Sequence, residues 1–228
     1  MIIAVLLALQ AEPKFEDKTI EHGGGPVKYQ VCVPSGYDGS KPMPLILFLH
    51  GSGEQGDDGV KQSSVGIGPA IKANPKGWAP YITVIPQKPK GRGGWMEHEA
   101  LMLGVVEKTK KEYKIDESRL YLTGLSMGGY GSWVLAAKHP GMWAAVAPIC
   151  GGGNPADGPK LKDLPIWAFH GDKDTAVPLR KSEEMIEAIK AAGGAAKLTV
   201  YPGVGHNSWD KAYREEKLWE WFLQYAKK

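Results

Sequence analysis

The sequence has few of the features with which proteins bind metals, nucleotides or nucleic acids. It holds only 2 cysteines and 6 histidines in 228 residues, and these do not have the spacing of metal ligands. No glycine-rich phosphate loop with a following lysine is present. The 28 basic and 25 acidic residues are interspersed and leave a net charge of +3, so there is no basic stripe and no polybasic membrane patch. We therefore expect no metal, no cofactor and no nucleic-acid partner.

Long apolar runs are also missing. Met1 to Leu9 is almost wholly apolar, but it is too short to span a bilayer and no Lys or Arg precedes it. Gln10-Ala11-Glu12-Pro13 follows this run as a secretory cleavage site would. We expect residues 1–11 to be a signal-peptide remnant and the protein to be secreted or periplasmic, without stable membrane insertion. A structural N-terminal strand, a mis-set start and a cytoplasmic location are the alternatives.

After this leader, strand and helix signals alternate along the chain. Two β-prone runs, Phe15 to Glu21 and Val27 to Val33, flank a glycine-rich turn and predict a hairpin. The pattern predicts further strands at 45–49, 81–85, 120–123, 144–149, 166–169 and 198–201, and helices at 97–113, from 127, from 182 and over 218–225. This order predicts an α/β fold, with a mostly parallel eight-stranded sheet and helices on both faces. Residues 12–228 are expected to form a single domain.

Local signals make some of these predictions more specific. Ser182 is expected to cap the helix that begins there, because two glutamates follow it. Leu218, Trp221, Phe222 and Tyr225 have the i, i+3, i+4, i+7 spacing of one buried helix face.

The two cysteines do not identify a redox compartment. Cys32 lies in the second predicted strand and Cys150 directly follows a much later one. Those strands should be well separated in the sheet, so we expect two free and mostly buried thiols. A disulfide would form only if the two ends met.

The strongest chemical signal is the stretch from Arg119 to Tyr130. It predicts a strand, then a glycine-flanked serine, then a helix. Gly124-Leu-Ser126-Met-Gly128 fits G-x-S-x-G, the nucleophile elbow that holds a serine hydroxyl clear of the backbone. In a chain with 30 glycines an ordinary turn is the alternative. The flanking strand and helix favour a catalytic serine.

A serine hydroxyl needs a base and an acid partner before it acts as a nucleophile. His206 lies on a glycine-rich loop after the last predicted strand, where its ring can reach the elbow, and a surface histidine is the alternative. Asp172 and Asp174 both lie after the preceding strand, and both are candidates for the acid. His50 and His170 each precede a glycine at a strand end and are expected to bond to nearby backbone. The remaining histidines are expected to be solvated or structural: His22, His98 and His139.

The negative charge formed on an ester carbonyl needs two backbone N–H donors. One should be the amide of Met127, directly after the candidate nucleophile. The other should come from the glycine-rich loop after the strand at 45–49, and Ser52 is our candidate.

With these residues in place, the chain resembles α/β-hydrolases over residues 15 to 226. It is most similar to small bacterial phospholipase/carboxylesterase or prolyl-oligopeptidase-like esterases, which are related to dienelactone hydrolases, acyl-protein thioesterases and feruloyl esterases. The resemblance implies that Asp174 is the acid, and Asp172 is then expected to tie down its own loop. It is carried by five ordered motifs: Leu47-Phe-Leu-His-Gly-Ser-Gly-Glu54, Gly124-Leu-Ser-Met-Gly-Gly129, Pro148-Ile-Cys-Gly-Gly-Gly153, Phe169-His-Gly-Asp-Lys-Asp-Thr-Ala-Val-Pro178 and Gly205-His-Asn-Ser-Trp209.

One departure from lidded relatives bears on the substrate. Only about fifteen residues separate the strands that end at Ile149 and begin at Ile166, which leaves no room for a cap domain. The site should be open, which favours short-chain esters or exposed esters on polymers. Trp95 and Trp209 would line it, or else would simply pack their loops onto the core.

The sequence thus predicts a cofactor-independent serine carboxylesterase acting through Ser126, His206 and Asp174. The alternatives are a feruloyl or acetyl esterase acting on plant polysaccharide, and a non-catalytic binding protein with this fold.

Overall fold

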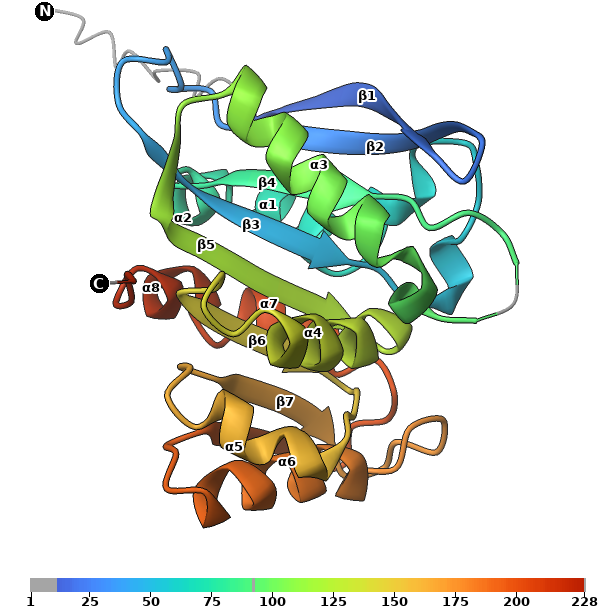
Figure 1. Ribbon diagram of the computed structural model, residues 1–228, viewed down its shortest axis with the longest axis vertical. Coiled ribbons are helices and arrows are strands. Elements are labelled where there is room, and N and C mark those ends of the chain that lie inside the picture. Colours follow the sequence, from blue (N-terminus) through green and yellow to red (C-terminus); the bar gives the residue numbers. More distant parts are fainter. Residues whose placement is uncertain (1–11, 92, 228) are drawn as a thin grey trace, which may run out of the picture.

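The structure is a computed structural model that describes residues 12–91 and 93–227. The predicted signal-peptide remnant, residues 1–11, lies outside the described residues. Eight strands form one sheet in the order β1-β2-β4-β3-β5-β6-β7-β8 (Figure 1). Their bounds are β1 Lys14–His22, β2 Gly25–Val33, β3 Met43–Leu49, β4 Ile82–Pro86, β5 Ile115–Leu125, β6 Ala145–Ile149, β7 Trp167–Gly171 and β8 Lys197–Tyr201.

The predicted α/β arrangement is confirmed. β1 and β2 form the expected antiparallel hairpin, and β2 is antiparallel to β4. From β4 to β8 every neighbouring pair is parallel. In parallel sheets of this kind, polar loops gather at the carboxyl ends of the strands. This geometry brings the loops after β3, β5, β7 and β8 to one edge.

Helices cover both faces of the sheet, as predicted. In Figure 1, α3, α4, α5 and α6 lie in front, and α1, α2, α7 and α8 lie behind. Their bounds are α1 Ile67–Ala73, α2 Pro75–Trp78, α3 Glu99–Glu112, α4 Met127–Lys138, α5 Gly158–Leu161, α6 Arg180–Ala191, α7 Trp209–Arg214 and α8 Leu218–Phe222. Short 3₁₀ turns are η1 Ser52–Glu54, η2 Lys61–Ser63, η3 Trp95–His98 and η4 Pro155–Asp157.

Strand β3 shows why the sheet needs two helical layers. Its side chains are apolar along the whole length and alternate between faces. Leu45, Leu47 and Leu49 enter the core with α3 and α4, whereas Ile46 and Phe48 enter the core with α1 and α7. Both cores are closed, so β3 is fixed in position and so is the loop that follows it.

The prediction that Ser182 caps a helix is wrong. α6 begins two residues earlier, at Arg180, and Ser182 is fully buried inside it. Its hydroxyl lies 2.8 Å from His170 Nδ1 and 2.9 Å from the Gly151 carbonyl oxygen. The side chain therefore joins α6 to β7 and to the loop after β6.

The predicted closing helix over 218–225 is confirmed in place but not in length, because α8 ends at Phe222. α7 and α8 are separate helices, because Lys217 between them adopts a left-handed conformation with φ 51°. Leu218 and Phe222 are buried as the stripe predicted, but Tyr225 lies beyond α8. Its carbonyl oxygen accepts a hydrogen bond from the Tyr121 hydroxyl, which ties the end of the described chain to β5.

The absence of a cap domain is confirmed for the described residues. The segment from β6 to β7 contains only η4 and α5, a short 3₁₀ turn and one helical turn.

Candidate active site

Ser126 lies at the sharp turn between β5 and α4. Its backbone has φ 54° and ψ −118°, a region that residues with a side chain rarely adopt. The turn is held on both sides, because Ser126 N donates to the Ile149 carbonyl oxygen and Tyr130 N donates to the Ser126 carbonyl oxygen, each at 3.0 Å. Strain of this kind persists only where the surroundings fix it, which is typical of functional sites.

Glycine is required on both sides of this serine because neighbouring backbone lies too close for a side chain. A Cβ at Gly128 would lie 1.9 Å from the Leu49 carbonyl oxygen, and one at Gly124 would lie 2.5 Å from the Gly128 carbonyl oxygen. The G-x-S-x-G spacing therefore has a packing cause in this fold. It lets the start of α4 press against the end of β3.

Three predicted residues come together in one chain of hydrogen bonds. His206 Nε2 lies 2.8 Å from Ser126 Oγ, and His206 Nδ1 lies 2.7 Å from Asp174 Oδ2. A carboxylate accepts only, so Nδ1 carries the proton of the neutral ring and Nε2 is left to accept from the serine hydroxyl. This tautomer is the one in which a histidine can take a proton from serine.

Asp174 is fixed independently of His206. Its Oδ1 accepts the backbone N–H groups of Ala176 and Val177 at 2.9 and 2.8 Å. His170, on the preceding strand, is fully buried with Nε2 2.8 Å from the Val177 carbonyl oxygen and 3.3 Å from Asp174 Oδ2. Burial lowers the pKa of His170. Its backbone contact agrees with the prediction for this histidine.

Asp172 does not tie down its own loop as predicted. Its Oδ1 accepts the Gly203 N–H at 2.7 Å, so it reaches across to the loop after β8. The two candidate acids thus hold the same loop, residues 202–208, which we call the β8 loop. Asp174 bonds to it through His206 and Asp172 bonds to it through the backbone.

The loop after β3, residues 50–56, lies on the other side of Ser126, and we call it the β3 loop. A Cβ built on Gly51 would lie 3.6 Å from Ser126 Cβ, so the β3 loop and the serine turn are in contact. His50 holds the loop from inside. Its Nε2 accepts the Lys88 N–H at 2.9 Å, and its Nδ1 lies 2.6 Å from the Gly51 carbonyl oxygen. Burial lowers the pKa of His50 to about 4, so the ring is neutral at pH 7.

A pocket of about 420 Å³ opens between the β3 loop and the start of α4. Both candidate oxyanion residues line it. Trp95 is 1% exposed; it borders the pocket while its Nε1 donates to the His50 carbonyl oxygen at 2.9 Å. It thus both packs the loop and lines the site. The lining residues are Ser52, Gln55, Gly93, Gly94, Trp95, Met96, Met127, Tyr130 and Gly131.

Trp209, which was also expected to line the site, does not border this pocket. Its ring packs edge-on against the His206 ring, with centroids 5.3 Å apart. A larger hollow of about 790 Å³ lies near Trp143 and Leu164, which precede β6 and β7. It is therefore at the amino ends of these strands, away from Ser126.

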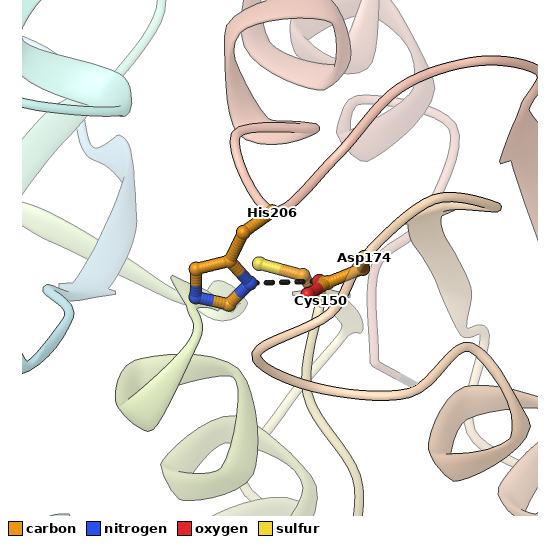
Figure 2. Close-up of side chains that lie close together, drawn as sticks. All are labelled: Cys150, Asp174 and His206. Atoms are coloured by element: carbon orange, nitrogen blue, oxygen red, sulfur yellow. Dashed lines mark hydrogen bonds and ion pairs between the residues drawn. The ribbon is translucent and has the colours of Figure 1, made fainter.

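Sequence reasoning missed several residues that lie at the site. Gln55, Met96 and Tyr130 line the pocket, but only the tertiary packing of the β3 loop, η3 and α4 places them there. Cys150 lies beside Asp174 and His206, with its sulfur within 4.8 Å of their ligand atoms (Figure 2). Its place directly after β6, the strand next to β5, was the available signal. Cys32 and Cys150 are both free and buried, as predicted.

No helix in the described parts of the chain is long and apolar enough to cross a membrane.

Several proteins with related sequences align with this chain over part of their own length. A carboxymethylenebutenolidase-like protein of Salmonella typhimurium is 31% identical over 132 residues, which cover 50% of this chain and 49% of that protein. A protein of Aspergillus terreus named as a probable feruloyl esterase C is 30% identical over 178 residues, which cover 76% of this chain and 64% of that protein. The match thus spans about half to just under two thirds of these relatives.

Solved structures of esterases share the fold. A thermostable esterase superposes with a TM-score of 0.82 at 30% identity, covering 93% of this chain and 63% of that chain. The feruloyl esterase module of Clostridium thermocellum, in complex with sinapinate, superposes with a TM-score of 0.73 at 18% identity, covering 89% of this chain and 84% of that chain. The second likeness concerns the fold alone.

The sequence profile of the dienelactone hydrolase family matches residues 97–227, a segment that includes Ser126, Asp174 and His206. Because this match covers more than half of the chain, the protein belongs to the dienelactone hydrolase family, whose fold is that of the α/β-hydrolases.

Proposed function

We propose that the protein is a serine carboxylesterase that works through Ser126, His206 and Asp174. The observation that carries this proposal is the continuous hydrogen-bond chain from Ser126 Oγ through both nitrogens of His206 to Asp174 Oδ2. His206 would take the serine proton through Nε2 as Ser126 Oγ attacks the ester carbonyl carbon. Asp174 would hold the tautomer and stabilise the imidazolium. The family relationship supports hydrolysis as the reaction class.

The rest of the reaction follows from the same geometry. The negative charge on the carbonyl oxygen would be bound by the backbone N–H groups of Met127 and Ser52, which border one pocket. His206 would return its proton to the leaving alcohol, and an acyl group would remain on Ser126. Water, activated by His206 in turn, would release the acid. No cofactor takes part in these steps.

The open site favours short-chain or exposed esters. No cap covers it in the described chain, and a pocket of about 420 Å³ offers room for a small acyl group. A second candidate is a feruloyl or acetyl esterase acting on plant polysaccharide. It is favoured by the aromatic and thioether lining from Trp95, Met96, Met127 and Tyr130, and by the relative named as a feruloyl esterase. Secretion, predicted from residues 1–11, agrees with a polymer-linked substrate.

Hydrolysis of four esters tests both candidates. p-Nitrophenyl acetate, butyrate and octanoate, together with methyl ferulate, are offered to the wild type, Ser126→Ala and Ser35→Ala. Removal of a catalytic serine costs about a millionfold in kcat, so Ser126→Ala should have no measurable activity. Ser35 is exposed and far along the chain from the site, and its variant should retain activity. Preference for methyl ferulate would favour the second candidate. Full activity of Ser126→Ala would refute the proposed nucleophile, and an inactive folded wild type would support a binding protein.

A further inference from the structure

The Cys150 thiol lies against the proposed acid and base. Figure 2 shows the sulfur beside the hydrogen bond between His206 and Asp174. Cys150 Sγ, a carboxylate oxygen of Asp174 and a ring nitrogen of His206 all lie within 4.8 Å of one another. These are the three donor types that Zn²⁺ prefers in proteins. Cys150 follows β6, Asp174 follows β7 and His206 follows β8. Only the fold brings these three loops together.

A fourth polar group at this place has no partner. Ser208 is fully buried, and among the described side chains its Oγ makes no hydrogen bond. The hydroxyl neighbours the Cys150 thiol. A buried hydroxyl next to the Cys150 thiol thus adds a fourth polar group to the three convergent donors.

We propose that Cys150, Asp174 and His206 form an inhibitory site for a thiophilic divalent cation such as Zn²⁺ or Cd²⁺, with Ser208 beside it. The ion would take the place of the proton between His206 Nδ1 and Asp174 Oδ2, and the thiolate of Cys150 would complete three ligands. Tetrahedral Zn²⁺ ligands lie about 3.4 to 3.8 Å apart at normal bond lengths, so the cluster has to adjust by about 1 Å.

Charge and access agree with this occupant. A thiolate and a carboxylate together cancel the charge of a divalent cation, so the loaded site is neutral although it is buried. Asp174 has no exposed side-chain area, whereas the His206 side chain is 28% exposed and gives the ion its entry. The Cys150 thiol must be deprotonated to bind the ion, so one proton leaves as the ion binds.

The ion would stop the proposed reaction through the tautomer of His206. Metal at Nδ1 leaves the ring proton on Nε2, because a neutral imidazole carries one proton. Nε2 then donates toward Ser126 Oγ and cannot accept its proton. Asp174 is also withdrawn from its hydrogen bond with the ring. Binding should therefore abolish turnover, and this consequence rests on the proposed function.

Binding and inhibition are measured separately on the whole chain. Titration with Cd²⁺ should give a thiolate-to-metal charge-transfer band that saturates at one equivalent, and Zn²⁺ should compete for it. The same Zn²⁺ concentrations should inhibit ester hydrolysis. Cys150→Ala and the nearly isosteric Cys150→Ser should lose the band and should weaken inhibition by Zn²⁺ at least about 10-fold. Loss of a residue that only supports a metal ligand already weakens metal binding about 10- to 100-fold. Cys32→Ala removes the other buried thiol and should change neither result.

Absence of the band in the wild type would overturn the proposal, as would a band lost in Cys32→Ala. Unchanged Zn²⁺ inhibition in both folded Cys150 variants would overturn it as well. A band at Cys150 in a protein without esterase activity would support the metal site and refute the proposed function.

Discussion

The two loops that flank Ser126 are held in opposite ways. The β3 loop is fixed from inside by buried groups: His50 bonds within the loop and to Lys88, and Trp95 bonds to the His50 carbonyl oxygen. The β8 loop is held mainly by carboxylates, Asp172 on its backbone and Asp174 on the partly exposed ring of His206, together with one backbone bond from the Lys173 N–H to the Val204 carbonyl oxygen. The difference matches what each loop is proposed to supply. Backbone N–H donors are positioned only when the chain itself is fixed, whereas a base needs one strong bond that orients its ring.

The largest effect should come from the carboxylate that holds the ring. Asp174→Asn should lower kcat by about 10⁴-fold, because an amide no longer favours a proton on Nδ1. Asp172→Asn keeps an oxygen for the Gly203 N–H and should change kcat by no more than about twofold. Rates on p-nitrophenyl acetate at saturation compare the two. Equal losses in both variants would mean that the aspartates act only by holding the β8 loop.

The place where the elbow meets the end of β3 should be next in sensitivity. Gly128→Ala puts a Cβ 1.9 Å from the Leu49 carbonyl oxygen, so α4 or β3 must move. We expect a loss of about 3 kcal/mol or more in the free energy of unfolding, measured by urea denaturation. Gly141→Ala, where a Cβ meets nothing within 4 Å, is the control and should be nearly neutral. A stable, active Gly128→Ala protein would show that the close contact is not needed.

His50 should make the β3 loop sensitive to acid. Its folded pKa is about 4 against an ordinary 6.5, so the neutral ring stabilises the fold fully above pH 6.5. That stability is lost as pH falls from 6.5 to 4, by about 3 kcal/mol for a shift of this size. Denaturation of the wild type and His50→Gln across this range isolates the contribution of His50. Parallel curves for the two proteins would mean that the ring is not buried in its neutral form.

These sites differ in how far sequence could predict them. Ser126 and the strands along the chain were predictable, because glycine spacing and apolar runs are local signals of a turn and of buried strands. From the residues alone, Asp172 and Asp174 were equal candidates, since both follow β7 and differ only in where their side chains point. Which of them meets His206 depends on the path of the β8 loop, and β8 is three strands along the sheet from β5.

The pocket was the least predictable part. Gln55, Met96 and Tyr130 border it only because the β3 loop, η3 and the start of α4 converge, and no spacing along the chain records that convergence. Ser182 was mistaken for a cap because a serine before two glutamates is a local signal. In the fold, the Ser182 hydroxyl instead bonds to His170 and to the Gly151 carbonyl oxygen inside the core. Local signals failed where tertiary contacts compete for the same polar group.

A smaller effect should come from the charge behind the β3 loop. Lys88 is fully buried, and its Nζ donates to Gln55 Oε1 at 2.9 Å; Gln55 Nε2 in turn donates to the Ser52 carbonyl oxygen at 3.1 Å. This relay links a buried ammonium to the turn that carries a proposed oxyanion donor. Lys88→Met keeps the length and the backbone bond to His50 but leaves Gln55 without its anchor.

We expect Lys88→Met to lower kcat by about 10-fold with little change in KM, since a hydrogen bond to a charged group contributes about 1.5 to 3 kcal/mol and only part of it should reach the transition state. Lys90→Met, at an exposed lysine two residues on, is the matched control and should leave both constants unchanged. Gln55→Leu should repeat the loss, and adding it to Lys88→Met should add little, because both changes break one relay. Additive losses, or a rise in KM alone, would place Lys88 and Gln55 in substrate binding rather than in holding Ser52, and the contrast between the two loops would then rest on His50 and Trp95 alone.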